Sequence, residues 1–187
     1  MLSVREMQIG DIPSFIQYWF NADHTYLHSM GVDVSKMPTA EKLFQMLSEQ
    51  LNNPIEKKTS YCVIWENNGE SIGHSNTNPT RYGEEAKMHL HLWSPEKRKK
   101  GMGTELLKMT LPYYFENLKL KTLWCEPYAL NTAPNKTLER AGFKLVKEYF
   151  GIPSFIGFEQ PVKQWMMSYE DYKTLSKQPG LQIYKKE

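Results

Sequence analysis

Residues 86–104 read AKMHLHLWSPEKRKKGMGT and carry the strongest structural signals in the chain. Residues 86–93 alternate apolar and polar side chains, which is typical of a strand with one buried face. Pro95 ends this strand, and apolar residues recur at helical spacing over residues 101–118, where Pro112 is expected to interrupt the helix. The stretch therefore predicts a strand, a turn and a helix in succession.

The turn between this strand and this helix has the composition of an anion site. Gly101 and Gly103 allow the backbone to turn tightly and to approach a ligand closely. The first turn of the helix offers free N–H groups and the positive end of the helix dipole, which suits a pyrophosphate. Further polar groups lie on four neighbouring residues, Arg98, Lys99, Lys100 and Thr104. The alternative is a solvated basic turn whose glycines serve only its geometry.

Two other phosphate-binding patterns are excluded in this turn. The P-loop pattern is absent, and Leu106 occupies the position at which the dinucleotide fingerprint needs its third glycine.

The rest of the chain predicts a mixed α/β sheet. Strands are expected at residues 2–8, 61–66, 70–76, 86–93, 121–126, 143–150 and 162–168, and helices at residues 12–20, 39–51, 101–118, 134–141 and 169–176. Asn67, Asn68 and Gly69 form a hairpin turn, whereas residues 21–38 are expected to be mostly loop. Hairpins followed by strand–helix–strand units predict one domain, residues 1–187, with helices on both faces of the sheet.

Composition narrows the class of protein. The chain has 187 residues, 40% of them hydrophobic and 13% aromatic, and a net charge of +2, which predicts a folded protein without general attraction to nucleic acid or an anionic membrane. Cys62 and Cys125 lie in separate apolar runs and are expected to be reduced, buried thiols. The N-terminus does not resemble a signal peptide, and no run reaches the ~18 apolar residues of a membrane helix. We therefore expect a cytoplasmic protein.

Two motifs resemble a known family. The run RKKGMG, from Arg98 to Gly103, matches the R/Q-x-x-G-x-G/A motif of the GNAT superfamily of N-acetyltransferases. Residues 131–143, NTAPNKTLERAGF, resemble the N-x-x-S-N-x-x-x-E-K-x-G-F helix of the branch that contains the RimJ and RimL acetyltransferases. The matching positions are Asn131, Asn135, Glu139, Gly142 and Phe143. Pro134 replaces the serine of that pattern, and Arg140 replaces its lysine.

This resemblance implies a fold and a co-substrate. The fold would be a mostly antiparallel, twisted GNAT-like sheet in which two neighbouring strands splay apart to admit the pantetheine arm of acetyl-CoA. The arm would bond to the backbone of Leu92 and Trp93, and Asn131 and Asn135 would lie near the thioester. The pyrophosphate would bind the loop formed by Arg98, Lys99, Lys100, Gly101, Met102, Gly103 and Thr104. No metal is implied.

The expected reaction, acetyl transfer to an amine, indicates which side chains are candidate catalytic residues. A free alkylamine has a pKa near ~10, so a base assists its attack. Glu126 ends the strand that faces the thioester and is the first candidate base, with a surface or turn-capping carboxylate as the alternative. His91 and His89 share one face of their strand and are further candidates, although packed histidines are the alternative and no third metal ligand lies nearby. Tyr128 is a candidate acid, because Leu138 occupies the position of the tyrosine that serves many family members.

Acceptor recognition is expected in two variable segments. Residues 21–38 supply His24, Tyr26 and His28, and residues 151–161 supply Phe155, Phe158 and Glu159, although these side chains could equally cover the core. The main hypothesis is an N-acetyltransferase that acts on a small-molecule amine or a protein N-terminus, as a monomer or homodimer without nucleic-acid or membrane partners. The alternatives are a catalytically silent acyl-CoA sensor and a binder of nucleic acid or another phospholigand.

Overall fold

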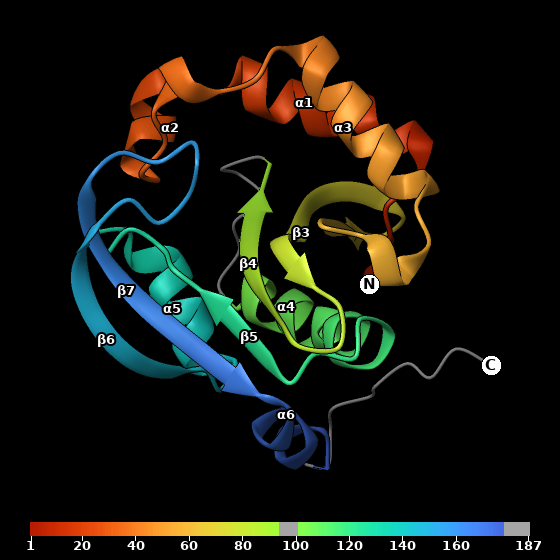
Figure 1. Cartoon of the computed structure of the whole chain (residues 1–187), viewed down its shortest axis with the longest axis vertical. Helices are drawn as coiled ribbons and strands as arrows, with labels where there is room; N and C mark the ends of the chain where they lie inside the picture. The colour runs from red at the N-terminus through yellow and green to blue at the C-terminus, as the bar shows by residue number, and fades with distance from the viewer. Residues whose placement is uncertain (94–100, 178–187) are drawn as a thin grey trace.

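Seven strands form one mixed sheet in the computed structural model, which describes residues 1–93 and 101–177 (Figure 1). The strands are β1 (Leu2–Glu6), β2 (Tyr61–Asn67), β3 (Glu70–Arg81), β4 (Glu85–Leu92), β5 (Thr122–Cys125), β6 (Lys144–Gly151) and β7 (Gln160–Ser168). They lie in the order β1–β2–β3–β4–β5–β7–β6. Neighbours are antiparallel except β4 and β5, which are parallel. The predicted mixed, mostly antiparallel sheet is therefore confirmed.

Helices cover both faces of this sheet. The helices are α1 (Ile12–Asn21), α2 (His24–Ser29), α3 (Ala40–Asn52), α4 (Met102–Pro112), α5 (Thr132–Arg140) and α6 (Tyr169–Ser176). Strand β2 shows how the faces are divided: Val63 and Trp65 pack into the core that α4, α5 and α6 cover, whereas Cys62 and Ile64 pack towards α1 and α3. The alternation of apolar side chains along the strand produces this division.

Residues 21–38 differ from the loop that the sequence predicts. They contain α2 and a short 3₁₀ turn, Val34–Lys36. The Asp23 carboxylate accepts hydrogen bonds from the N–H groups of Thr25 and Tyr26, and Leu27 is buried. A capped turn with one buried apolar side chain is stable here because it packs against the rest of the protein.

The helix predicted at residues 101–118 changes its pitch at Pro112. Helix α4 ends at this proline, and a π-helical segment, Tyr113–Asn117, follows it directly. Proline lacks the N–H group that an α-helix needs at this position, so the interruption has the expected cause.

Both cysteines are free and buried, as predicted. Burial raises the pKa of both thiols, that of Cys125 to about 12. None of the helices in residues 1–93 and 101–177 combines the length and apolar character needed to span a bilayer. The predicted pyrophosphate ligands Arg98, Lys99 and Lys100 lie outside the described residues.

Candidate active site

Strands β4 and β5 diverge, and this opens the sheet at its centre. The two strands pair only from Glu85 with Thr122 to Met88 with Cys125. Beyond Met88, β4 continues beside β3 to Leu92, whereas the chain beyond β5 stays with β7 through a bridge between Tyr128 and Val162. The predicted splay is therefore present. On the side of β4 that faces β5, the backbone of residues 89–92 is therefore not paired with β5.

The described part of the predicted anion loop begins helix α4. Gly101 has φ +89°, a left-handed conformation that favours glycine, and it forms the N-cap of the helix. A Cβ atom added at Gly103 would lie 3.7 Å from the Thr137 hydroxyl on α5, so packing alone does not require glycine there. The described residues thus place a helix N-terminus here, and anion binding by its N–H groups stays a prediction.

Asn135 organises the turn that follows β5. Its side chain is 8% exposed, and its amide nitrogen donates to the carbonyl oxygens of Tyr128 at 3.1 Å and Asn131 at 2.7 Å. Its carbonyl oxygen accepts a hydrogen bond from the Trp165 indole at 2.8 Å. Within the described residues, these contacts use both ends of the amide. They give Asn135 a structural role, and its direct contact with a co-substrate stays a prediction.

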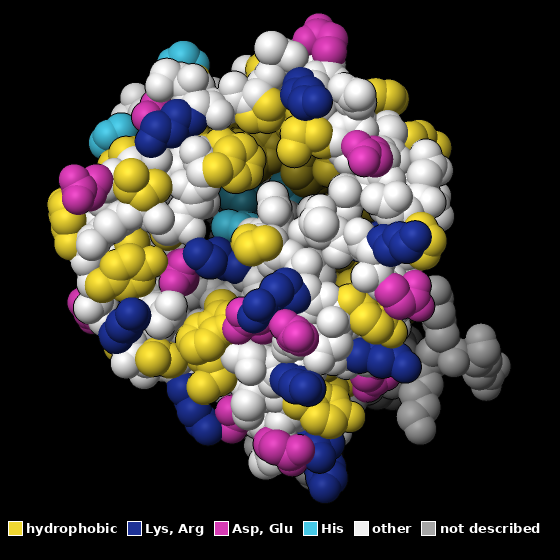
Figure 2. Space-filling model, viewed as in Figure 1, with side chains coloured by type: hydrophobic (Ala, Val, Ile, Leu, Met, Phe, Trp, Pro, Cys, Tyr) yellow, Lys and Arg dark blue, Asp and Glu magenta, His cyan; other side chains and the backbone are white. Residues whose placement is uncertain are grey.

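A cavity of about 660 Å³ opens on the face that α1 and α3 cover. Figure 2 shows it as a hollow with hydrophobic side chains along its upper rim and histidine atoms in its depth. Met88 and Pro127, one from each side of the diverging strands, both line it. Its apolar wall comprises Phe15, Trp19, Met30, Val32, Met37, Leu43, Met46, Leu47, Phe155 and Ile156. The sequence did not assign the α1 and α3 side chains to a site, because their spacing is also that of ordinary core residues.

The two predicted acceptor segments meet at the edge of this cavity. Val32 and Gly157 form an isolated bridge, and the Lys36 ammonium donates to the Gly157 carbonyl oxygen at 2.7 Å. In Figure 1 the loop between β6 and β7 accordingly lies beside α2. Among the six acceptor side chains named from the sequence, Phe155 lines the cavity. The other five, His24, Tyr26, His28, Phe158 and Glu159, are outside its lining.

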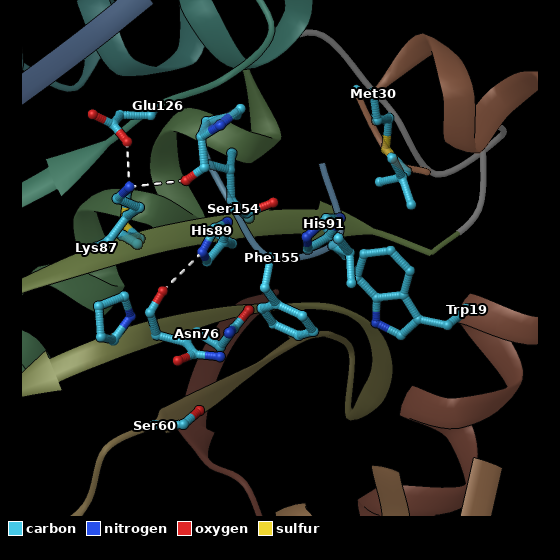
Figure 3. A pocket seen from close by; sticks show the side chains of 18 of the residues that line it. Trp19, Met30, Ser60, Asn76, Lys87, His89, His91, Glu126, Ser154 and Phe155 are labelled. Carbon is cyan, nitrogen blue, oxygen red and sulfur yellow. Dashed lines mark hydrogen bonds and ion pairs between the residues drawn. The ribbon is translucent and has the colours of Figure 1, made fainter. Parts of the chain in front are cut away.

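Lys87, His89 and His91 project from one face of β4 into the cavity (Figure 3). The His91 Nδ1 atom lies 3.1 Å from the Tyr18 hydroxyl, and its ring packs against Trp19. The His89 Nε2 atom lies 3.1 Å from the Asn78 carbonyl oxygen. A carbonyl can only accept, so Nε2 carries a proton and the lone pair of neutral His89 is on Nδ1. Burial lowers the pKa of His89, which favours this neutral form.

His74 packs against the cavity histidine His91 but is not among the lining residues. Its ring stacks on that of His91 at 4.9 Å, and its Nδ1 atom accepts a hydrogen bond from the Trp93 indole at 2.8 Å. Burial, together with the neighbouring His91 and His89, lowers the pKa of His74 well below its ordinary value. The sequence predicted a backbone role for Trp93 and gave no role to His74 or Tyr18. Their contacts join segments far apart in the chain.

Glu126 lies at the cavity wall with a cationic partner. Its carboxylate forms an ion pair with Lys87 and accepts a hydrogen bond from the Gln164 amide at 2.6 Å, and its side chain is 7% exposed (Figure 3). Lys87 also donates to the Pro153 carbonyl oxygen at 2.9 Å. The protein therefore compensates the charge of Glu126 internally. The predicted catalytic role of Glu126 stays a prediction.

Comparison with known proteins identifies the class. The chain is similar in structure to spermidine N-acetyltransferase from Vibrio cholerae in complex with CoA and spermine, with a TM-score of 0.74 and 17% identity over 92% of this chain and 98% of that one. It is also similar to a dodecameric structure of that Vibrio cholerae enzyme, with a TM-score of 0.69 and 19% identity over 91% and 95%. These likenesses establish the fold. A comparison with curated protein sequences finds no match.

The diverging strands and the adjoining cavity thus occur in a fold that this chain shares with those acetyltransferase structures. A family model described as acetyltransferase (GNAT) domain matches residues 2–144. The chain belongs to this family of acetyl-CoA-dependent acyltransferases. Among the described residues, no cluster of three metal-ligating side chains occurs.

Proposed function

We propose that the protein transfers the acetyl group of acetyl-CoA to the primary amine of a small molecule. The observation that carries this proposal is the gap between β4 and β5, which opens into the cavity between α1 and α3. The thioester would enter through the gap, and the amine would enter through the cavity. The enclosing walls favour a small molecule over a protein N-terminus, which needs a longer open groove.

The proposed cofactor contacts follow the described geometry. We assign the pantetheine arm to the backbone of Leu92 and Trp93, which lies beyond the end of the pairing between β4 and β5. The Trp93 N–H itself donates to the Ile72 carbonyl oxygen at 2.9 Å on the β3 side, which leaves Leu92 to face the open side. The N-terminus of α4 supplies Gly101, Met102, Gly103 and Thr104. We assign the pyrophosphate to this terminus together with Arg98, Lys99 and Lys100. Asn131 lines the cavity beside the thioester end, and Asn135 holds its turn in place.

His91 is our proposed general base, with Glu126 as the alternative. At neutral pH an alkylamine is mostly protonated, so a group in the cavity must accept a proton before the nitrogen attacks. His91 lines the cavity and is oriented by the Tyr18 hydroxyl. The amine nitrogen then bonds to the acetyl carbon, the carbon–sulfur bond breaks, and the CoA thiolate takes up a proton. Tyr128 lines the cavity and remains the candidate acid.

The catalytically silent sensor remains the second candidate function. Leu138, at the position of the tyrosine that serves many family members, is fully buried in the core and cannot supply an acid.

The block from Asn131 to Phe143 supports placement in the RimJ and RimL branch. We further propose a single domain of residues 1–187 that acts in the cytoplasm as a monomer or homodimer.

Thermal unfolding with acetyl-CoA, CoA, ATP or NAD tests the co-substrate, and release of free thiol with an amine panel tests the reaction. A ligand that binds only the folded state raises the melting temperature. We expect a rise with acetyl-CoA and CoA alone, and thiol release that depends on an amine. Binding without thiol release from any amine would support the sensor. Unchanged melting with both CoA species would refute both functions.

A further inference from the structure

The charges that line the cavity are nearly balanced without a ligand. Among the described residues, the cavity has one lysine, Lys87, and two carboxylates, Glu49 and Glu126. Lys87 pairs with Glu126, and Glu49 is exposed on α3. The buried part of the described lining therefore offers no uncompensated negative charge.

This balance is unsuited to a polyamine. Spermidine carries several positive charges at neutral pH, because each alkylamine has a pKa near ~10. A buried ammonium is costly unless a carboxylate or another acceptor pairs with it. Glu49 lies at the exposed part of the lining, so to bind a second ammonium in its buried part the cavity would have to break the pair between Lys87 and Glu126. That exchange would leave Lys87 unpaired beside the bound cation.

The walls suit a different kind of acceptor. Leu43, Met46 and Leu47 of α3 line the cavity together with the aromatic rings of Phe15 and Trp19 on α1, and Leu43, Leu47 and Trp19 pack against the same cluster as Phe15. Phe155 lines the same space and is 62% exposed, although it is a large apolar side chain (Figure 3). An exposed aromatic ring at the rim of an apolar cavity is available to stack on a ligand ring.

We propose that the acceptor is a primary monoamine with an apolar, arylalkyl body. This inference rests on the proposed acetyl transfer and specifies its substrate class. The ring of the acceptor packs among Phe155, Trp19 and the α3 side chains, and its single nitrogen points towards the histidines of β4. The pair between Lys87 and Glu126 excludes acceptors with additional cationic groups.

The first test compares two amines with the full-length protein. Thiol release from acetyl-CoA is measured with 2-phenylethylamine and with spermidine. We expect kcat/KM to be at least tenfold higher for 2-phenylethylamine. A preference for spermidine would overturn the substrate inference while leaving the proposed acetyl transfer intact. Binding of acetyl-CoA without turnover of any amine in a wider panel would overturn both.

Phe155→Ala tests the aromatic contact, with Phe150→Ala as the matched control. Phe150 is 67% exposed on β6, close in exposure to Phe155, and it does not line the cavity. Phe155→Ala should raise the KM for 2-phenylethylamine several-fold without changing the melting-temperature shift that acetyl-CoA produces. Phe150→Ala should change neither quantity. Equal effects of the two substitutions would contradict the proposed stacking.

Lys87→Met tests the ion pair, with Lys163→Met as its control. Lys87→Met removes the ammonium that compensates Glu126 at the cavity, whereas Lys163→Met breaks a pair with Glu148 outside it. The ratio of kcat/KM for spermidine to that for 2-phenylethylamine should rise at least tenfold in Lys87→Met and stay unchanged in Lys163→Met. An unchanged ratio in a folded Lys87→Met protein would show that the pair does not exclude polyamines.

Discussion

Replacing Asn135 by alanine should destabilise the ligand-free protein. The substitution removes hydrogen bonds to the Tyr128 and Asn131 carbonyl oxygens and leaves the Trp165 indole without its acceptor. At about 1 kcal/mol for each of these three contacts, the free energy of unfolding should fall by about 3 kcal/mol. For a chain of this length, that loss corresponds to a fall of roughly 6–12 °C in melting temperature.

Asn131→Ala is the matched control, because it changes the same residue type in the same turn. Asn131 is the N-cap of α5, yet its side chain makes no capping hydrogen bond, so its loss should cost under about 0.5 kcal/mol. Urea unfolding without ligand measures both variants, and a titration with acetyl-CoA follows. If Asn135→Ala left unfolding unchanged and weakened only acetyl-CoA binding, Asn135 would contact the co-substrate, and the structural role argued above would be wrong.

Three further predictions concern the anion loop, the buried histidines and the thiols. Gly103→Asp places a carboxylate at the proposed pyrophosphate site, where the protein itself leaves room, and should abolish the acetyl-CoA melting shift in a folded protein; an unchanged shift would remove this loop from the site. The pKa of His74 and that of His89 are lowered by burial, so the unfolded chain binds more protons below pH ~6.5 and the free energy of unfolding should fall from pH 7.5 to pH 5.5. Urea midpoints should show this fall, and His74→Gln should reduce it. Because their pKa values are raised, Cys62 and Cys125 should react slowly with a thiol reagent at pH 8 in the native protein and rapidly in urea, and fast native reaction would contradict their burial.

Local patterns predicted the sheet because each strand carries its own signal. The alternation of residues 86–93 becomes β4, and the turn at Asn68 and Gly69, both at positive φ, joins β2 to β3 as expected. Helix α2 was missed because its signals are a capping aspartate and one buried leucine within a polar segment. Tertiary packing, rather than local periodicity, stabilises such a short helix.

The candidate site was only partly predictable, because its contacts join distant segments. The sequence placed His89 and His91 on one face of a strand and Glu126 at the end of another. It could not show that Glu126 pairs with Lys87 or that Tyr18 lies beside His91. The sequence therefore predicted a catalytic role for Glu126 without the information that a lysine compensates its charge, and that role stays a prediction.

Strand β4 contributes different groups to the two proposed substrates, and this has a consequence for how specificity can change. Its odd-numbered side chains, Lys87, His89 and His91, face the acceptor cavity. Its backbone beyond Met88, where pairing with β5 ends, is the proposed contact for acetyl-CoA. Because successive side chains point to opposite faces, a substitution at an odd position alters the cavity and leaves the backbone edge in place. The charge of the cavity, and with it the class of amine, can thus change without loss of the co-substrate site.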